Sequence, residues 1–125
     1  MSQDYHQLDV WHRSMSYAVE IYRFAAQLPD AKRYNLASQL RRAATSVCLN
    51  IAEGSGCSTN QEFARFLGYA YRSLKEAATC LELCQRLYPD LPAQSLDTLV
   101  EESSQIARMT HSLIRRLTPR ARTEN

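Results

Sequence analysis

The sequence predicts an all-α fold, an antiparallel up-down-up-down four-helix bundle formed by a single domain over residues 1–125. Apolar residues recur every three or four positions in four long segments, and only short segments connect them. The chain has only 3 glycines and 4 prolines, too few for a turn-rich sandwich or barrel. Because connections of a few residues make sequential helices pack side by side, we expect each helix to run antiparallel to the one before it.

The first helix is expected at about residues 9–28, with a wide apolar arc made of two neighbouring stripes. One stripe consists of Val10, Tyr17, Ile21, Phe24 and Leu28. The other consists of Trp11, Met15, Ala18, Tyr22 and Ala25. Pro29 should end this helix, because proline disfavours the helical conformation in the residue before it.

The second helix is expected at about residues 32–53, and Gly54-Ser55-Gly56 should end it, because glycine tolerates the left-handed conformation that closes helices. The apolar face of this helix consists of Leu36, Leu40, Ala43, Val47 and Ile51.

The third and fourth helices are expected at about residues 59–88 and 93–117. Thr59 and Glu62 form a capping-box pattern, in which the Thr59 hydroxyl accepts a hydrogen bond from the Glu62 backbone and the Glu62 carboxylate reaches back. The seam of the third helix is Phe63, Leu67, Ala70, Leu74, Ala77, Leu81, Cys84 and Tyr88. The seam of the fourth helix is Leu96, Leu99, Ser103, Ile106, Thr110, Leu113 and Leu117. Residues 118–125 should form a frayed tail.

The composition is that of an ordinary globular protein, with 45% hydrophobic and 22% charged residues and a net charge of +2. No apolar run approaches the length of a membrane span, and the first residues lack the pattern of a secretory signal, so we expect a cytoplasmic protein with no membrane partner. Of the 15 basic residues, 13 are arginine. A net charge near zero does not by itself indicate a nucleic-acid-binding protein.

The residues that carry most enzyme chemistry are sparse, so we expect no catalytic residue, no metal and no cofactor. The histidines His6, His12 and His111 are scattered, and there is no Glu-x-x-His motif of a di-iron bundle. The four cysteines, which have no C-x-x-C spacing, are expected to be small apolar fillers or bystanders: Cys48, Cys57, Cys80 and Cys84.

A polar stripe lies beside the apolar face of the second helix. Its members are Asn35, Gln39, Arg42, Ser46, Asn50 and Glu53. Serine and asparagine are poor mid-helix residues, because their side chains compete for backbone hydrogen bonds. The stripe therefore indicates a partly buried hydrogen-bonding surface, either within the bundle or against a neighbouring subunit, and an ordinary solvated face is the alternative.

Several basic residues are candidates for contacts to nucleic-acid phosphates, because the arginine fork matches phosphate oxygens. They are Lys32, Arg33, Arg41, Arg65, Arg72, Lys75, Arg115, Arg116, Arg120 and Arg122. The simpler alternative for each is a surface ion pair, such as Arg72 with Glu76. Acidic residues gather near the start of the fourth helix and arginines at its end, so the small net charge is a difference between separated patches.

Several segments together resemble one family. Residues 39–47 (QLRRAATSV) followed by Asn50-Ile51-Ala52-Glu53-Gly54 resemble the core signature of the four-helix-bundle proteins of the 23S rRNA intervening-sequence family. Residues 8–11 look like its opening motif, and residues 62–67 and 73–76 are similar to its third helix. The likeness spans roughly residues 8–117. Cys48 stands where proline is common in the family, which should leave the second helix straighter.

The resemblance implies a ring assembled from identical bundles, typically a homopentamer. It also implies kinship with Avd, the accessory variability determinant of diversity-generating retroelements, whose rings bind a reverse transcriptase and nucleic acid. The expected function is therefore a non-enzymatic accessory protein that binds RNA or DNA and serves a reverse transcriptase. The alternative is a protein-interaction scaffold without nucleic-acid binding, and an enzyme is the least favoured class.

Overall fold

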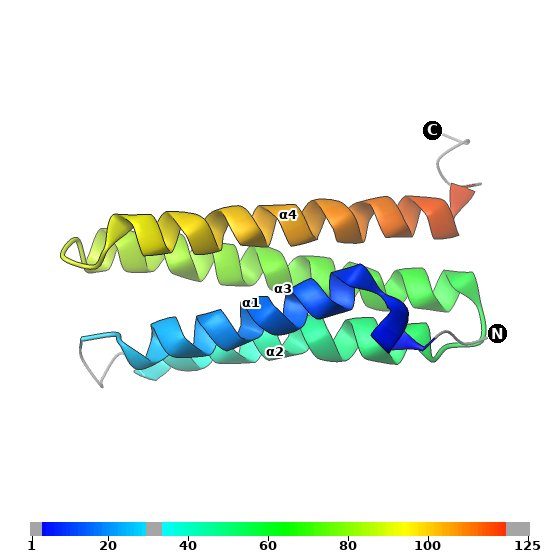
Figure 1. Ribbon diagram of the computed structural model, residues 1–125, viewed down its shortest axis with the longest axis horizontal. Helices are drawn as coiled ribbons and strands as arrows, with labels where there is room; N and C mark the ends of the chain where they lie inside the picture. The colour runs from blue at the N-terminus through cyan, green and yellow to red at the C-terminus, as the bar shows by residue number, and fades with distance from the viewer. Residues whose placement is uncertain (1–3, 30–33, 120–125) are drawn as a thin grey trace.

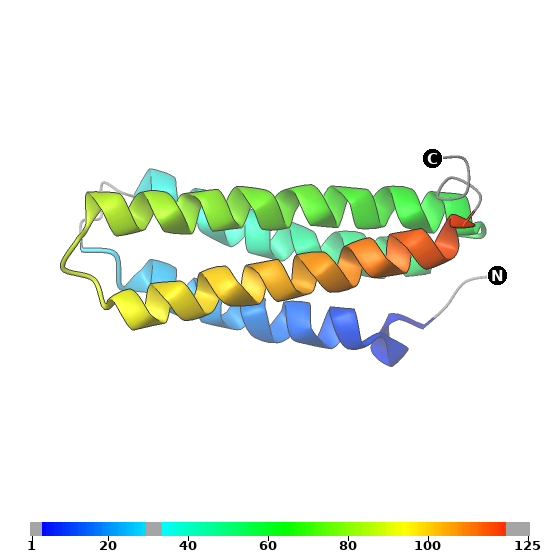
Figure 2. The same cartoon turned by 90° about the horizontal axis from the view of Figure 1, so that it is seen from above.

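A computed structural model describes residues 4–29 and 34–119, and these form a short 3-10 turn followed by four long helices (Figure 1). The elements are η1 (Tyr5–Gln7), α1 (Asp9–Ala26), α2 (Tyr34–Ser55), α3 (Asn60–Leu87) and α4 (Ala93–Leu117). The helices alternate in direction, and the view from above shows α3 and α4 lying over α1 and α2 (Figure 2). The described residues contain no strand, so the predicted all-α bundle is confirmed.

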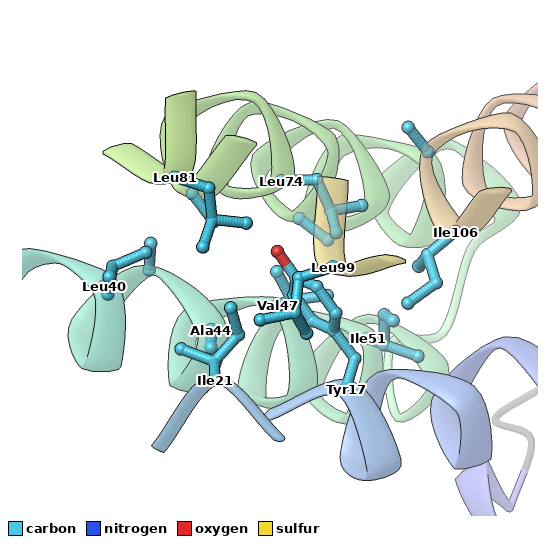
Figure 3. Packing of buried hydrophobic residues seen from close by; sticks show 14 of the residues in the cluster. Tyr17, Ile21, Leu40, Ala44, Val47, Ile51, Leu74, Leu81, Leu99 and Ile106 are labelled. Carbon is cyan, nitrogen blue, oxygen red and sulfur yellow. The ribbon is translucent and has the colours of Figure 1, made fainter. Parts of the chain in front are cut away.

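The core runs along the axis of the bundle, where the predicted apolar faces of all four helices meet (Figure 3). Its largest fully buried side chains include Ile21 of α1, Leu40 and Ile51 of α2, Leu74 of α3 and Ile106 of α4. α2 packs against α1 and α3, and α4 packs against α3 and closes the bundle against α1. Burial of these side chains is the main force that holds four separately amphipathic helices together.

The two predicted stripes of α1 are buried to different extents, and Ala25 is the only fully buried member of the second stripe. Tyr17 and Ile21 are 1% and 0% exposed, whereas Met15 and Tyr22 of the other stripe are 41% and 46% exposed. The sequence makes both stripes apolar, and the rotation of α1 against its neighbours selects the stripe that is buried. Met15 and Tyr22 remain on the surface, and the Tyr22 hydroxyl lies 3.0 Å from Thr45 Oγ1 of α2.

The prediction that Gly54 ends α2 through a left-handed conformation is wrong. The helix continues through Gly54 to Ser55, and no described residue has a positive φ. Gly54 is buried, and a Cβ atom there would lie 2.8 Å from Phe66 Cβ and 2.9 Å from Phe63 Cδ1. The glycine therefore permits the close approach of α3 to the end of α2, and it does not terminate the helix by left-handed geometry.

The start of α3 and the bounds of α4 agree with the sequence. Thr59 is the N-cap of α3, and its Oγ1 accepts a hydrogen bond from the backbone N–H of Glu62 at 3.1 Å. The Glu62 carboxylate is directed to Arg65, 3.4 Å away. In the described part of the chain, no helix has both the length and the apolar character required to cross a membrane.

Candidate nucleic-acid interface

Basic side chains collect where the first half of α3 lies beside the second half of α4. The two helices are antiparallel, so the Tyr71 ring of α3 is next to the His111 ring of α4, with 6.0 Å between the ring centroids. Arg72 and Lys75 are exposed on α3, and Arg108 and Arg115 are exposed on α4. The antiparallel arrangement thus brings together cations that are more than thirty positions apart in the sequence.

Three cations of α3 lie over aromatic rings of the same helix. Arg65 is 5.8 Å from the centroid of Phe66, Arg72 is 5.7 Å from that of Tyr69, and Lys75 Nζ is 5.3 Å from that of Tyr71. Cation–π attraction at exposed sites holds such side chains close to the helix surface without neutralising their charge. The outer side of α3 therefore combines aromatic faces with positive charge.

A surface hollow of about 500 Å³ lies between the start of α1 and the end of α4, and a second of about 330 Å³ lies between α3 and α4. The second is lined by Tyr71, Lys75, Ser104, Ala107, Arg108, His111 and Ser112. This lining has hydroxyl groups, two constant cations and a histidine, and it contains no carboxylate. Four other hollows on the described surface all include a carboxylate, for example Asp9 or Glu20.

We call this second hollow the α3–α4 groove, and one of its lining residues, Arg108, is paired with an acid outside the lining, Glu101. Its Oε2 lies 3.5 Å from Arg108 Nη2, and the two side chains are 66% and 63% exposed. A pair this exposed and this long contributes little, so an anionic ligand can replace the carboxylate at Arg108. The electrostatics of the groove therefore favour an anion.

The first half of α4 has the opposite character. Arg13 of α1 donates two hydrogen bonds to the Glu102 carboxylate, at 3.0 Å from Nε and 2.7 Å from Nη2. This contact raises the pKa of the Arg13 guanidinium. Asp97 and Glu101 lie in the same hollow as Glu102. The two halves of α4 thus carry opposite charge.

The comparisons with known proteins agree with this architecture. The family model described as 23S rRNA-intervening sequence protein matches residues 6–112. The chain belongs to the 23S rRNA-intervening sequence protein family. This match includes the groove residues from Tyr71 to Ser112.

A solved relative has the same fold. A crystal structure of a protein with unknown function from the S23 ribosomal protein family of Bacteroides thetaiotaomicron is similar, with a TM-score of 0.77 and 24% sequence identity. The likeness covers 84% of this chain and 97% of that chain. At this identity the comparison shows a shared fold alone. A search of curated proteins found no significant match.

The basic residues predicted to contact phosphates do not lie in one place in the structure. Lys75 lines the α3–α4 groove, and Arg65, Arg72, Arg115 and Arg116 are exposed on the same two helices. Arg41 is half-buried on α2. Four candidates lie outside the described residues: Lys32, Arg33, Arg120 and Arg122.

Three groove residues were missed as binding residues by reasoning from the sequence: Tyr71, Arg108 and His111. Arg108, His111 and Arg115 are spaced three and four positions apart, so they share one face of α4. That spacing was a usable signal for the cations of α4. The contact between Tyr71 and His111 depends on the register between α3 and α4, so the sequence of neither helix predicts it.

The polar stripe of α2 divides between the surface and a hydrogen-bonded contact. Gln39, Arg42 and Glu53 are exposed, whereas Ser46 and Asn50 are half-buried. Asn50 Nδ2 donates to the backbone carbonyl and to Oγ of Ser46, both at 2.9 Å. Ser73 of α3 donates its hydroxyl to Ser46 Oγ, also at 2.9 Å. This part of the stripe contributes a polar contact between α2 and α3.

The described residues contain no group of three or more metal-binding side chains of the His, Cys, Asp and Glu types. The His6 ring lies 2.9 Å from the Asp4 carboxylate, and the His12 ring lies 2.8 Å from the His6 carbonyl. The four cysteines are free thiols. Burial raises the pKa of Cys48 and Cys84 to about 11, which disfavours the reactive thiolate form at neutral pH.

Proposed function

We propose that this family member is a non-catalytic protein that binds nucleic acid through the α3–α4 groove and the cations around it. The observation that carries the proposal is the lining of the groove, where Lys75, Arg108 and His111 meet without a carboxylate. A net charge of +2 is compatible with this proposal because the lining of the groove contains cations and no carboxylate, whereas the acidic residues of α4 lie in its first half.

The chemistry of the cations supports a phosphate ligand. An arginine presents a planar fork of donors that matches two phosphate oxygens, and a lysine provides a compact charge. Arg72 and Arg115 extend the positive surface beyond the groove along both helices. An extended polyanion can contact several of these groups at once, whereas a single small anion cannot.

We also propose that identical chains assemble through the opposite face of the bundle. Four apolar side chains are 41–58% exposed on α1 and α2, namely Met15, Val19, Tyr22 and Leu49. Exposed apolar patches mark interaction surfaces, and the exposed members of the α2 polar stripe lie beside Leu49 in the helical register. A ring such as a homopentamer, implied by the resemblance to Avd, would leave α3 and α4 free. Light scattering of the wild type and of Leu49→Ser tests assembly, and a monomeric wild type would contradict it.

The nucleic-acid proposal is tested by the salt dependence of binding. We expect a labelled RNA to bind at about 50 mM salt and to lose affinity steeply towards about 200 mM, because phosphate contacts release counterions. Lys75→Gln should weaken binding and reduce the salt slope by about 1. Arg23→Gln removes one positive charge from α1 and serves as the matched control. Absence of binding at low salt would overturn the proposal.

The second candidate function is a protein-interaction scaffold, and the exposed apolar side chains of α1 and α2 favour it. The kinship with Avd that the sequence resemblance implies makes a reverse transcriptase the proposed protein partner. Purification of the tagged protein after nuclease treatment separates the two functions. A protein partner that remains bound without nucleic acid, together with no affinity for RNA or DNA, would favour the scaffold.

A further inference from the structure

We infer that the α3–α4 groove binds an unpaired nucleotide, whose base stacks on the Tyr71 and His111 rings while Lys75 and Arg108 hold its phosphates. The inference rests on the proposed function and makes it more specific, because it assigns the site to single-stranded nucleic acid. It depends on the two rings as well as on the charge.

The two rings adjoin each other in the groove, one from each helix, so a base that stacks on the Tyr71 ring also contacts the tilted His111 ring. Their centroids are 6.0 Å apart and their planes are inclined by 46°. Tyr71 is half-buried and packs against the core, which fixes the position of its ring, while His111 is exposed. Every nucleobase offers a flat face, so aromatic platforms bind single strands with little regard to sequence. In a duplex those faces are already covered by neighbouring base pairs.

The cations are placed for the phosphates of a stacked nucleotide. Lys75 Nζ lies over the Tyr71 ring, 5.3 Å from its centroid, so a base that stacks on this face displaces the ammonium group towards the adjoining phosphate. Arg108 lines the same groove from α4. Ser104 and Ser112 add hydroxyl groups that can bond to phosphate or sugar oxygens. Glu101, 3.5 Å from Arg108, is the acid that a phosphate would displace.

The size of the groove also favours a single strand. Its volume is about 330 Å³, near the lower limit of about 300 Å³ for small-molecule pockets. The groove between the side-by-side helices α3 and α4 can accept a base that is turned outwards from its strand. The convex backbone of a duplex would contact the rims and leave the rings unused.

Fluorescence anisotropy with three labelled probes tests the inference: oligo-U and oligo-dT of about 12 nucleotides and a duplex of similar length. We expect Tyr71→Leu to weaken binding of both single strands by roughly five- to hundredfold, as for the loss of one base–ring stack. Tyr71→Phe should retain the affinity. Tyr5→Leu removes a half-buried ring of η1 that does not line the groove, and it should have little effect. His111→Ala should also weaken single-strand binding, and its exposed position keeps folding unaffected.

The outcomes separate the inference from the proposed function. Selective loss of single-strand binding supports both. If Lys75→Gln weakens binding while Tyr71→Leu and His111→Ala do not, the charged surface binds nucleic acid and the stacking site is wrong. Equal weakening of duplex binding by Tyr71→Leu also overturns the inference. If no probe binds at low salt, the proposed function itself fails.

Discussion

Tyr17 of α1 and Ser103 of α4 meet at the centre of the bundle, where their hydroxyl groups share a hydrogen bond. Both side chains are almost fully buried, at 1% and 2% exposure. Ser103 also donates to the Leu99 carbonyl at 3.0 Å, so the Tyr17 hydroxyl is the donor between the two side chains. This hydrogen bond is a polar contact that fixes the register of α1 against α4 within an otherwise apolar core.

Removal of the two partners should have unequal effects. Tyr17→Phe leaves Ser103 bonded to Leu99, so we expect the free energy of unfolding to fall by about 1 kcal/mol. Ser103→Ala leaves the buried Tyr17 hydroxyl without an acceptor and should lower the free energy of unfolding by about 2 kcal/mol. Urea denaturation of both variants and of the double variant measures the coupling. Equal costs, or additivity in the double variant, would contradict the assigned direction of the bond.

The burial of the Tyr17 hydroxyl makes stability sensitive to alkaline pH. Burial raises the pKa of Tyr17 from its ordinary value of 10.0 to about 12. The folded state therefore keeps this proton while the unfolded state releases it, and stability is lost as pH rises from about 10 to about 12. Between about pH 9 and about pH 11 the wild type should lose about 1 kcal/mol more than Tyr17→Phe. Urea denaturation at the two pH values measures the difference, and parallel losses would refute it.

The glycines Gly54 and Gly68 should respond to alanine in opposite directions. A Cβ atom at Gly54 would lie 2.8 Å from Phe66 Cβ, whereas one at Gly68 would have nothing within 4 Å. Gly68→Ala should therefore raise the free energy of unfolding by about 0.5–1 kcal/mol, through helix propensity. Gly54→Ala should lower it by roughly 1 kcal/mol, because overpacking exceeds the same gain. Thermal and urea denaturation give both signs, and a stabilising Gly54→Ala would show that α3 moves away easily.

The ion pair between Arg13 and Glu102 should stabilise the protein more than that between Arg23 and Glu20. The first pair is bidentate, with side chains 41% and 31% exposed, whereas the second is 69% and 55% exposed. Arg13→Met should cost about 0.5–1 kcal/mol at low salt and less at high salt. Arg23→Met is the matched control and should be close to neutral. Indistinguishable urea midpoints for the two variants would contradict this ranking.

Much of the fold follows from local patterns. The four periodic segments became four helices, and the Thr59 cap and the bounds of α4 lie where the sequence places them. These features depend on residues within a few positions of one another, so the sequence expresses them directly. The role of Gly54 was different, because its need for space comes from Phe63 and Phe66 on the following helix.

The candidate site was only partly accessible to the same reasoning. Arg72 and Lys75 were identified by residue type, and the division of α4 into an acidic and a basic half was visible along the chain. Tyr71 and His111 became candidate binding residues only because the structure places their rings side by side. Neither residue type in isolation distinguishes a stacking platform from a surface side chain.

The sequence alone determined the number of helices, the apolar and polar faces of each helix, and the separation of charge along α4. Each of these is a property of neighbouring residues. The tertiary structure decided that Tyr17 and Ile21, and not Met15 and Tyr22, occupy the core. It also decided that a groove without carboxylates lies between α3 and α4. Both depend on the rotation and register of whole helices, which the packing of the entire core sets and no single segment encodes.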